Sequence, residues 1–220
     1  MSIQRDVGLM KIKRTIKALK KNNINGYYAA SREEAAELVK SLVAQGSVIS
    51  CGGSETLGES GILDLMKSGR YTFLDRSAPG LSPEALRELY ISTYGCDCFF
   101  MSANAVTEQG ELYNVDGNGN RISALIHGPK KVVVIAGVNK IVRNIEEAVY
   151  RVKTVAAPCN GVRLNTGTPC ALTGKCVAAD GQMTDGCACE KRMCVHYLVS
   201  AYQRNKDRIH VIFLNEELGY

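Results

Sequence analysis

Cysteine is concentrated near the C-terminal end of this 220-residue chain. Five of the nine cysteines fall between positions 170 and 194, and three glycines in the same stretch permit the tight turns that gather sulfurs around one point. Thiolates are soft ligands that suit zinc or an iron–sulfur cluster, so the pattern predicts a metal centre. The candidate ligands are Cys170, Cys176, Cys187, Cys189 and Cys194.

The spacing of these cysteines is C-x5-C-x10-C-x-C-x4-C, which is no standard zinc-finger or ferredoxin pattern. The cysteine cluster therefore predicts a metal centre but does not identify the metal. An iron–sulfur cluster of the 4Fe–4S type is favoured, and structural zinc is the alternative. Redox-active disulfides and a loop of free thiols also stay open.

A second candidate for chemistry is the glycine-rich loop 52–61, which follows the buried apolar run 47–51 and precedes a helical pattern. Ligands of an open α/β sheet bind outside the carboxyl ends of the strands, and glycines let the backbone approach an anion. The loop matches neither the dinucleotide-binding fingerprint nor the phosphate-binding Walker loop, so it does not indicate a particular nucleotide ligand. An ordinary strand-to-helix turn is the competing interpretation.

The polar segment 114–121 is rich in turn residues, and its simplest interpretation is the tip of a β-hairpin spanning 111–126. We also expect it to share one cleft with the glycine loop. Arg121 is the expected anion partner, because its planar fork pairs bidentately with carboxylate or phosphate. The candidate ligand-binding residues are Gly53, Ser54, Glu55, Thr56, Asp116, Asn118, Asn120, Arg121 and Lys140.

The elements that position these residues alternate between apolar runs and amphipathic helical patterns, which predicts one open α/β sheet with helices on both faces. Helix starts are expected at Ser31, Ser82 and Asn144. Strands are expected at 48–51, 71–74, 98–106, 131–136 and 208–214, with the apolar run 131–136 at the centre. We expect a single domain over 1–220, with an amphipathic helix in 1–24, an antiparallel hairpin excursion and a C-terminal cysteine-rich segment at 158–196.

The net charge of +5 comes largely from the first 21 residues, where a solvated basic helix face is the simplest interpretation. We expect no nucleic-acid partner, because no aromatic interleaving or binding motif accompanies the charge. No apolar run is long enough to cross a bilayer and no signal peptide is evident, so a cytoplasmic location is expected. In that compartment cysteines are thiols or metal ligands rather than structural disulfides.

Several segments together resemble the LUD-domain (lactate-utilisation) family. They are GGSETLGESGI, ANAVTEQGELYNVDGNGNRISALIHGPKKVVVIAGVNKIV, AAPCNGVRLNTGTPC and the closing FLNEELGY. The resemblance covers nearly the whole chain. It implies a Rossmann-like sheet related to the ribose-5-phosphate isomerase and CoA-transferase superfamily, and an association with iron–sulfur-dependent oxidation of L-lactate to pyruvate.

Many members of that family carry a PC–TG–C–DC–RIC pattern near the C-terminus. In this sequence the matching positions are Pro169-Cys170, Thr173-Gly174, Cys176, Cys187 and Arg192-Met193-Cys194. Two departures affect the expected metal centre. An insertion at 177–186 separates the second and third ligands, and Cys189 is an additional thiol that competes with Cys187 as a ligand.

We therefore expect a LUD-domain protein that binds a small anionic metabolite and takes part in lactate-type, 2-hydroxy-acid redox metabolism. One alternative is a sugar-phosphate isomerase or acyl/CoA-transfer enzyme with structural zinc. Another is a non-catalytic subunit that docks on an iron–sulfur redox partner. Association with a second copy of the chain is also open.

Overall fold

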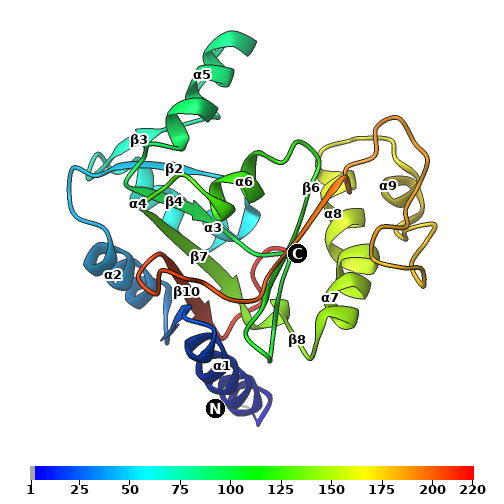
Figure 1. Cartoon of the computed structure of the whole chain (residues 1–220), viewed down its shortest axis with the longest axis horizontal. Helices are drawn as coiled ribbons and strands as arrows, with labels where there is room; N and C mark the ends of the chain where they lie inside the picture. The colour runs from blue at the N-terminus through cyan, green and yellow to red at the C-terminus, as the bar shows by residue number, and fades with distance from the viewer. Residues whose placement is uncertain (1–2) are drawn as a thin grey trace.

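The computed structural model describes residues 3–220, which form two sheets with helices around them (Figure 1). The larger sheet has six strands in the order β1-β10-β7-β4-β2-β3, and every neighbouring pair is parallel. Its strands are β1 (Asn25–Ala29), β2 (Val48–Cys51), β3 (Thr72–Leu74), β4 (Cys98–Met101), β7 (Lys131–Gly137) and β10 (Ile209–Leu214). The α/β fold with an open, mostly parallel sheet is thus confirmed.

The smaller sheet has four strands in the order β8-β5-β6-β9. They are β5 (Ala105–Thr107), β6 (Leu112–Asp116), β8 (Ile141–Val142) and β9 (His196–Ser200). Strand β6 is antiparallel to both of its neighbours, β5 and β9. This sheet carries the cysteine-rich segment, which leads directly into β9.

Helices cover both faces of the larger sheet, as the sequence predicts. They are α1 (Ile3–Lys21), α2 (Arg32–Leu42), α3 (Glu55–Glu59), α4 (Ile62–Lys67), α5 (Pro83–Thr93), α6 (Asn120–Ile126), α7 (Ile145–Arg151), α8 (Ala157–Arg163) and α9 (Pro169–Thr173). A π-helical stretch, Val152–Ala156, joins α7 to α8. Helices α1 and α6 pack on one face, and α2, α3 and α4 pack on the other. Helix α5 buries only Thr93 and stands away from both sheets (Figure 1).

Strand β7 lies inside the larger sheet and shows why its apolar run is continuous. Val132 and Val134 pack in the core beneath α1, whereas Val133 and Ile135 pack in the core beneath α2. Successive side chains of a strand point to opposite faces, so a strand covered on both sides needs apolar residues at every position. The predicted central position of 131–136 is confirmed.

The structure corrects two predicted strands. The expected strand 98–106 is divided between β4 of the larger sheet and β5 of the smaller one. The antiparallel excursion exists, but its hairpin joins β5 to β6, and the second arm expected in 111–126 is the helix α6. Strand β6 ends at Asp116, and Gly119, with a left-handed φ of 76°, directly precedes α6. The Asp116 carboxylate accepts hydrogen bonds from the N–H groups of Arg121 and Ile122 at the start of α6. The turn residues therefore begin a helix instead of reversing a strand.

The predicted helix starts are confirmed. Ser31, Ser82 and Asn144 each accept a hydrogen bond from a backbone N–H in the first turn of α2, α5 and α7, respectively. The amphipathic N-terminal helix is α1, which buries Ile12 and Leu19; positions 1–2 of the expected 1–24 lie outside the described residues. No helix in the described part of the chain is both long and apolar enough to cross a membrane.

Candidate functional site

A cleft of about 540 Å³ opens where the strand ends of the larger sheet meet the β6–α6 turn. The glycine loop and segment 114–121 both line it, so the two loops share one cleft as the sequence predicts. The predicted residues that line the cleft are Gly53, Ser54, Glu55, Asp116, Asn118, Asn120, Arg121 and Lys140. Thr56 is buried behind the wall, where its hydroxyl accepts a hydrogen bond from Lys140.

The two loops are in close contact at Gly52. A Cβ atom at this position would lie 2.9 Å from Cδ of Arg121, so only glycine permits the approach. Ser54 then caps α3 by accepting a hydrogen bond from the backbone N–H of Leu57 at 3.3 Å. The loop is therefore both a helix start and one wall of the cleft.

Arg121 holds the wall of the cleft in place through hydrogen bonds to neighbouring protein groups. Its Nε donates to Asp116 at 3.0 Å, and its two Nη groups donate to Asn114, Asn104 and the carbonyls of residues 102 and 115. An arginine has five N–H donors, and all five are used inside the protein. Its side chain is only 12% exposed. This geometry does not offer the free fork that we expected to bind an anion, and makes Arg121 a structural support instead.

Arg76 is a cation of the cleft that keeps its donors free, and the sequence analysis did not select it. Arg76 lines the cleft, and its guanidinium stacks on the Tyr90 ring at 5.7 Å. Within residues 3–220 it has no hydrogen bond or ion pair, and its Nη1 lies 3.3 Å from where a Cβ of Gly53 would be. Its position two residues after β3 was the available signal, because strand ends gather along one edge of a parallel sheet.

Other charged groups on the rim leave the cleft cationic. Arg163 also lines it, but pairs with Glu55 at 3.2 Å. Lys191 and Glu190 reach the cleft from the cysteine-rich segment. Arg76 and Lys191 therefore favour an anionic ligand.

Lys140 has the most strongly shifted pKa among the residues that line the cleft. It is 4% exposed, and its Nζ donates to the hydroxyls of Thr56 at 2.8 Å and Ser102 at 3.1 Å. Burial, followed by the positive charges of Arg151 and Arg121, lowers the pKa of Lys140 to about 7. A lysine in this state is partly neutral near physiological pH.

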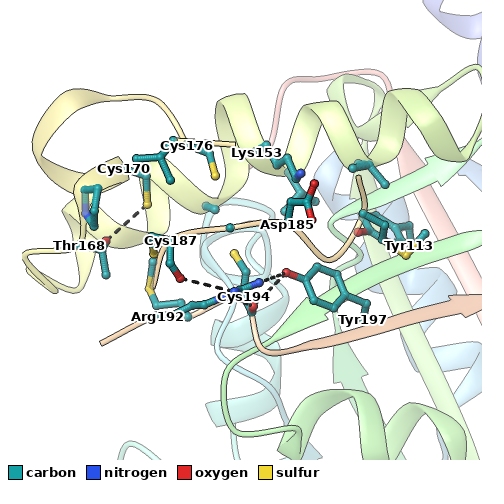
Figure 2. A pocket seen from close by; sticks show the side chains of 18 residues that line it. Tyr113, Lys153, Thr168, Cys170, Cys176, Asp185, Cys187, Arg192, Cys194 and Tyr197 are labelled. Atoms are coloured by element: carbon teal, nitrogen blue, oxygen red, sulfur yellow. Dashed lines mark hydrogen bonds between the residues drawn. The ribbon is translucent and has the colours of Figure 1, made fainter. Parts of the chain in front are cut away.

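A second, smaller hollow of about 30 Å³ lies beside the cleft and is lined by Cys170, Cys176, Cys187 and Cys194 (Figure 2). The first two come from α9 and the turn after it. The other two lie on the facing segment that leads to β9. Cys189 does not line this hollow, which makes Cys187 the better placed of the two rival thiols.

Two basic side chains shape the cysteine-rich segment. Arg192 donates to the carbonyls of Thr184, Cys187 and Cys194, which holds the two ends of the loop together. Lys153 donates to three carbonyls of the insertion, those of residues 178, 181 and 182. The insertion is therefore anchored to the π-helical stretch, on the far side of the hollow from β9.

The chemistry of the four cysteines is compatible with a metal centre. Burial raises the pKa of Cys194 to about 11, and Cys170 and Cys176 add to this increase, so a cluster of thiolates requires a compensating cation. As the side chains lie, no three metal-ligating groups among residues 3–220 are arranged to hold an ion. The metal centre stays a prediction, and the sulfurs would have to converge to form it.

The remaining cysteines have other surroundings. Cys51 and Cys98 are buried in strands of the larger sheet, and Cys96 is buried in the turn before β4; burial raises the pKa of each thiol. Cys159 is exposed on α8, outside the hollow. All nine cysteines are free thiols.

The cleft and the cysteine hollow share a wall. The residues that line both are Val152, Ala157, Arg192, Met193 and Cys194. A ligand in the cleft and a group bound by the four cysteines would therefore be direct neighbours.

Comparison with known proteins identifies one family. The LUD-domain family model matches residues 12–214. A crystal structure of a DUF162 family protein from Deinococcus radiodurans is similar at 16% sequence identity and a TM-score of 0.47, over 97% of this chain and 99% of that one. No curated protein matches the chain closely enough to be compared with it.

Proposed function

This chain belongs to the LUD-domain family, and from that membership and the cleft we propose that it binds a small anionic metabolite and takes part in lactate-type, 2-hydroxy-acid redox metabolism. The observation that carries the proposal is the wall shared by the cleft and the cysteine hollow. A substrate site beside a redox centre is the arrangement that such a reaction needs. We further propose that the redox centre is an iron–sulfur cluster, with zinc as the alternative.

The anion is held by the cationic side of the cleft. Arg76 has free donors to pair with a carboxylate, and Lys191 adds positive charge on the rim. Arg121 and Asp116 act indirectly, because their buried ion pair at 2.8 Å fixes the turn that carries the polar residues of the cleft. We expect Asn118 and Asn120, which line the cleft, to hydrogen-bond the oxygens of the ligand.

Cys170, Cys176, Cys187 and Cys194 would hold the metal centre. An iron–sulfur cluster in this position would supply one-electron transfer. The protein's own contribution is to orient the thiols and exclude water. Arg192 positions the loop that carries Cys187 and Cys194, and apolar Val152 and Met193 help to close the wall between the hollow and the cleft.

Metal analysis of protein purified without oxygen tests this proposal. We expect iron, acid-labile sulfide and broad visible absorption, all lost in Cys170→Ser and Cys194→Ser. Cys159→Ser is the matched control and should keep the metal, because this thiol is exposed on α8. Equimolar zinc without iron would assign the cysteines a structural role and remove the redox proposal. Protein without any metal would refute the metal centre.

The ligand half of the proposal has a separate test. L-lactate and pyruvate should raise the melting temperature of the protein, and high salt should weaken the effect because the cleft is cationic. Stabilisation by ribose 5-phosphate but by neither L-lactate nor pyruvate would support the isomerase-like alternative instead. If none of these anions stabilises the protein, the cleft is not an anion-binding site.

A further inference from the structure

Lys140 lies at the floor of the cleft, immediately after the central strand β7. Its side chain is almost fully buried between α3, the loop after β4 and the C-terminal residues, yet it contributes to the lining of the cleft. A Cβ on Gly219 would stand 3.5 Å from its Nζ, which shows how closely the chain surrounds the amine. Such burial is unusual for lysine, which is rarely buried without a charged partner.

The hydrogen bonds around the amine match its neutral form. The Thr56 hydroxyl donates to the carbonyl of Leu218 at 3.2 Å, and the Ser102 hydroxyl donates to the carbonyl of Ala103 at 3.4 Å. Both hydroxyls have therefore used their own hydrogens and accept from Nζ. A neutral amine has two N–H donors and one lone pair, so these two acceptors satisfy it and leave the lone pair free. The described chain provides no third acceptor for an ammonium group.

The charges that face the amine are mostly positive. Arg121 faces it from α6 and Arg151 from α7, and both guanidinium groups are fixed by hydrogen bonds to backbone carbonyls. Glu59 of α3 is the carboxylate that acts on it, but that group accepts from the N–H of Gly219 and forms no ion pair with the lysine. Burial and nearby cations activate a lysine as a nucleophile, and lower the pKa of Lys140 to about 7.

Lys153, the other buried lysine that faces a hollow, is a useful contrast. It is equally buried, but its Nζ donates to three carbonyl oxygens. Three acceptors match the three donors of an ammonium group, so Lys153 is a structural cation. Lys140 has one acceptor fewer and two arginines beside it. The two lysines therefore perform different tasks.

We propose that Lys140 is an amine nucleophile that forms an imine with the ketone carbon of a small 2-oxo acid bound in the cleft. The inference rests on the proposed function for its ligand class, because a 2-oxo acid carries a carboxylate for the cationic wall and a carbonyl for the amine. The Nζ lone pair attacks the carbonyl carbon, and the amine proton moves to the carbonyl oxygen. The carbinolamine then loses water as the C=N bond forms, so no oxidant or reductant is consumed.

Reductive trapping tests the proposal. The full-length protein is incubated with pyruvate and sodium cyanoborohydride, and intact mass and peptide mapping locate the adduct. We expect one reduced pyruvate per chain, on Lys140. The yield should rise about tenfold from pH 6 to pH 8 and level off there, as for a pKa near 7, whereas exposed lysines gain reactivity up to much higher pH.

Lys140→Arg should abolish the adduct, because a guanidinium is always protonated and is not nucleophilic. Lys130→Arg changes an exposed lysine outside the cleft and should leave the adduct unchanged. L-lactate, which lacks a ketone, should protect Lys140 without forming an adduct. Labelling spread over surface lysines, or none on Lys140, would overturn the imine proposal. If pyruvate still stabilises the protein in that case, the anion-binding function survives alone; if it does not, both fail.

Discussion

Arginine serves two purposes in this cleft, and burial distinguishes them. The Arg121 guanidinium is enclosed and has no free donor, so it holds the turn in place. Arg76 keeps its donors free and only stacks on Tyr90. Sequence reasoning brought the two loops into one cleft but selected an arginine without free donors, because the sequence does not reveal which carbonyls will converge on a side chain.

Arg76→Ala should weaken binding of an anionic ligand, because a hydrogen bond to a charged group contributes about 1.5–3 kcal/mol. Titration calorimetry with pyruvate measures the change, and the melting temperature without ligand should stay the same. Arg87→Ala is the matched control, since Arg87 is exposed on α5 outside the cleft. Unchanged affinity in Arg76→Ala would exclude a direct contact.

Arg121→Ala should instead lower the free energy of unfolding, by about 3–5 kcal/mol if it behaves as a broken buried ion pair. The reason is that Asp116, 9% exposed, would lose its partner, and the carbonyl of residue 102 would lose its donor. Chemical denaturation measures this loss. Lys130→Ala breaks an exposed pair with Asp97 and should cost at most about 1 kcal/mol. A fully stable Arg121→Ala would refute the structural role.

At the scale of elements, capping and strand patterns were predictable, but the identity of α6 was not. Its apolar residues fit a strand or a short helix equally well. The outcome depends on Asp116, which pairs with Arg121 and also accepts from the first N–H groups of the helix. The division between β4 and β5 was similarly hidden: both strands are buried at every position, and Ser102 and Asn104 between them did not by themselves indicate a change of sheet.

Gly52→Ala tests the contact between the glycine loop and α6. The added Cβ would lie 2.9 Å from Cδ of Arg121, whose fixed guanidinium cannot give way. We expect a lower melting temperature and weaker binding of pyruvate. Gly58→Ala within α3 is the control: no atom lies within 4 Å of its added Cβ, so it should stabilise the helix by about 0.5–1 kcal/mol. Equal behaviour of the two variants would contradict the close packing.

At the scale of the whole molecule, the two sheets have different structural roles. The larger one has two apolar cores and supplies stability, whereas the smaller one carries the cysteine-rich segment (Figure 1). The sequence predicted β2, β3, β4, β7 and β10 of the first sheet from their apolar runs, but it did not predict the edge strand β1, which is mostly half-buried. It did not predict the second, whose pairing joins β6 to β9, about 80 residues later in the chain.

Hydrogen exchange should reveal this division. We expect the slowest exchange in β7 and β10, which are buried along almost their whole length. The segment 175–195 should exchange rapidly in metal-free protein, because side-chain contacts and isolated turns hold it in place. Iron-loaded protein should protect that segment and leave β10 unchanged. Equal protection with and without metal would mean that the cysteines order themselves without it.

Met193 and Cys194 line both the cleft and the cysteine hollow, and this predicts the phenotypes of mutants at these positions. A lesion at Cys170 is expected to affect the metal alone, and a lesion at Arg76 the ligand alone. Changes at positions 193 and 194 should produce both defects at once. Alleles at these two positions would thus appear in the same screen as losses of metal retention and of metabolite use.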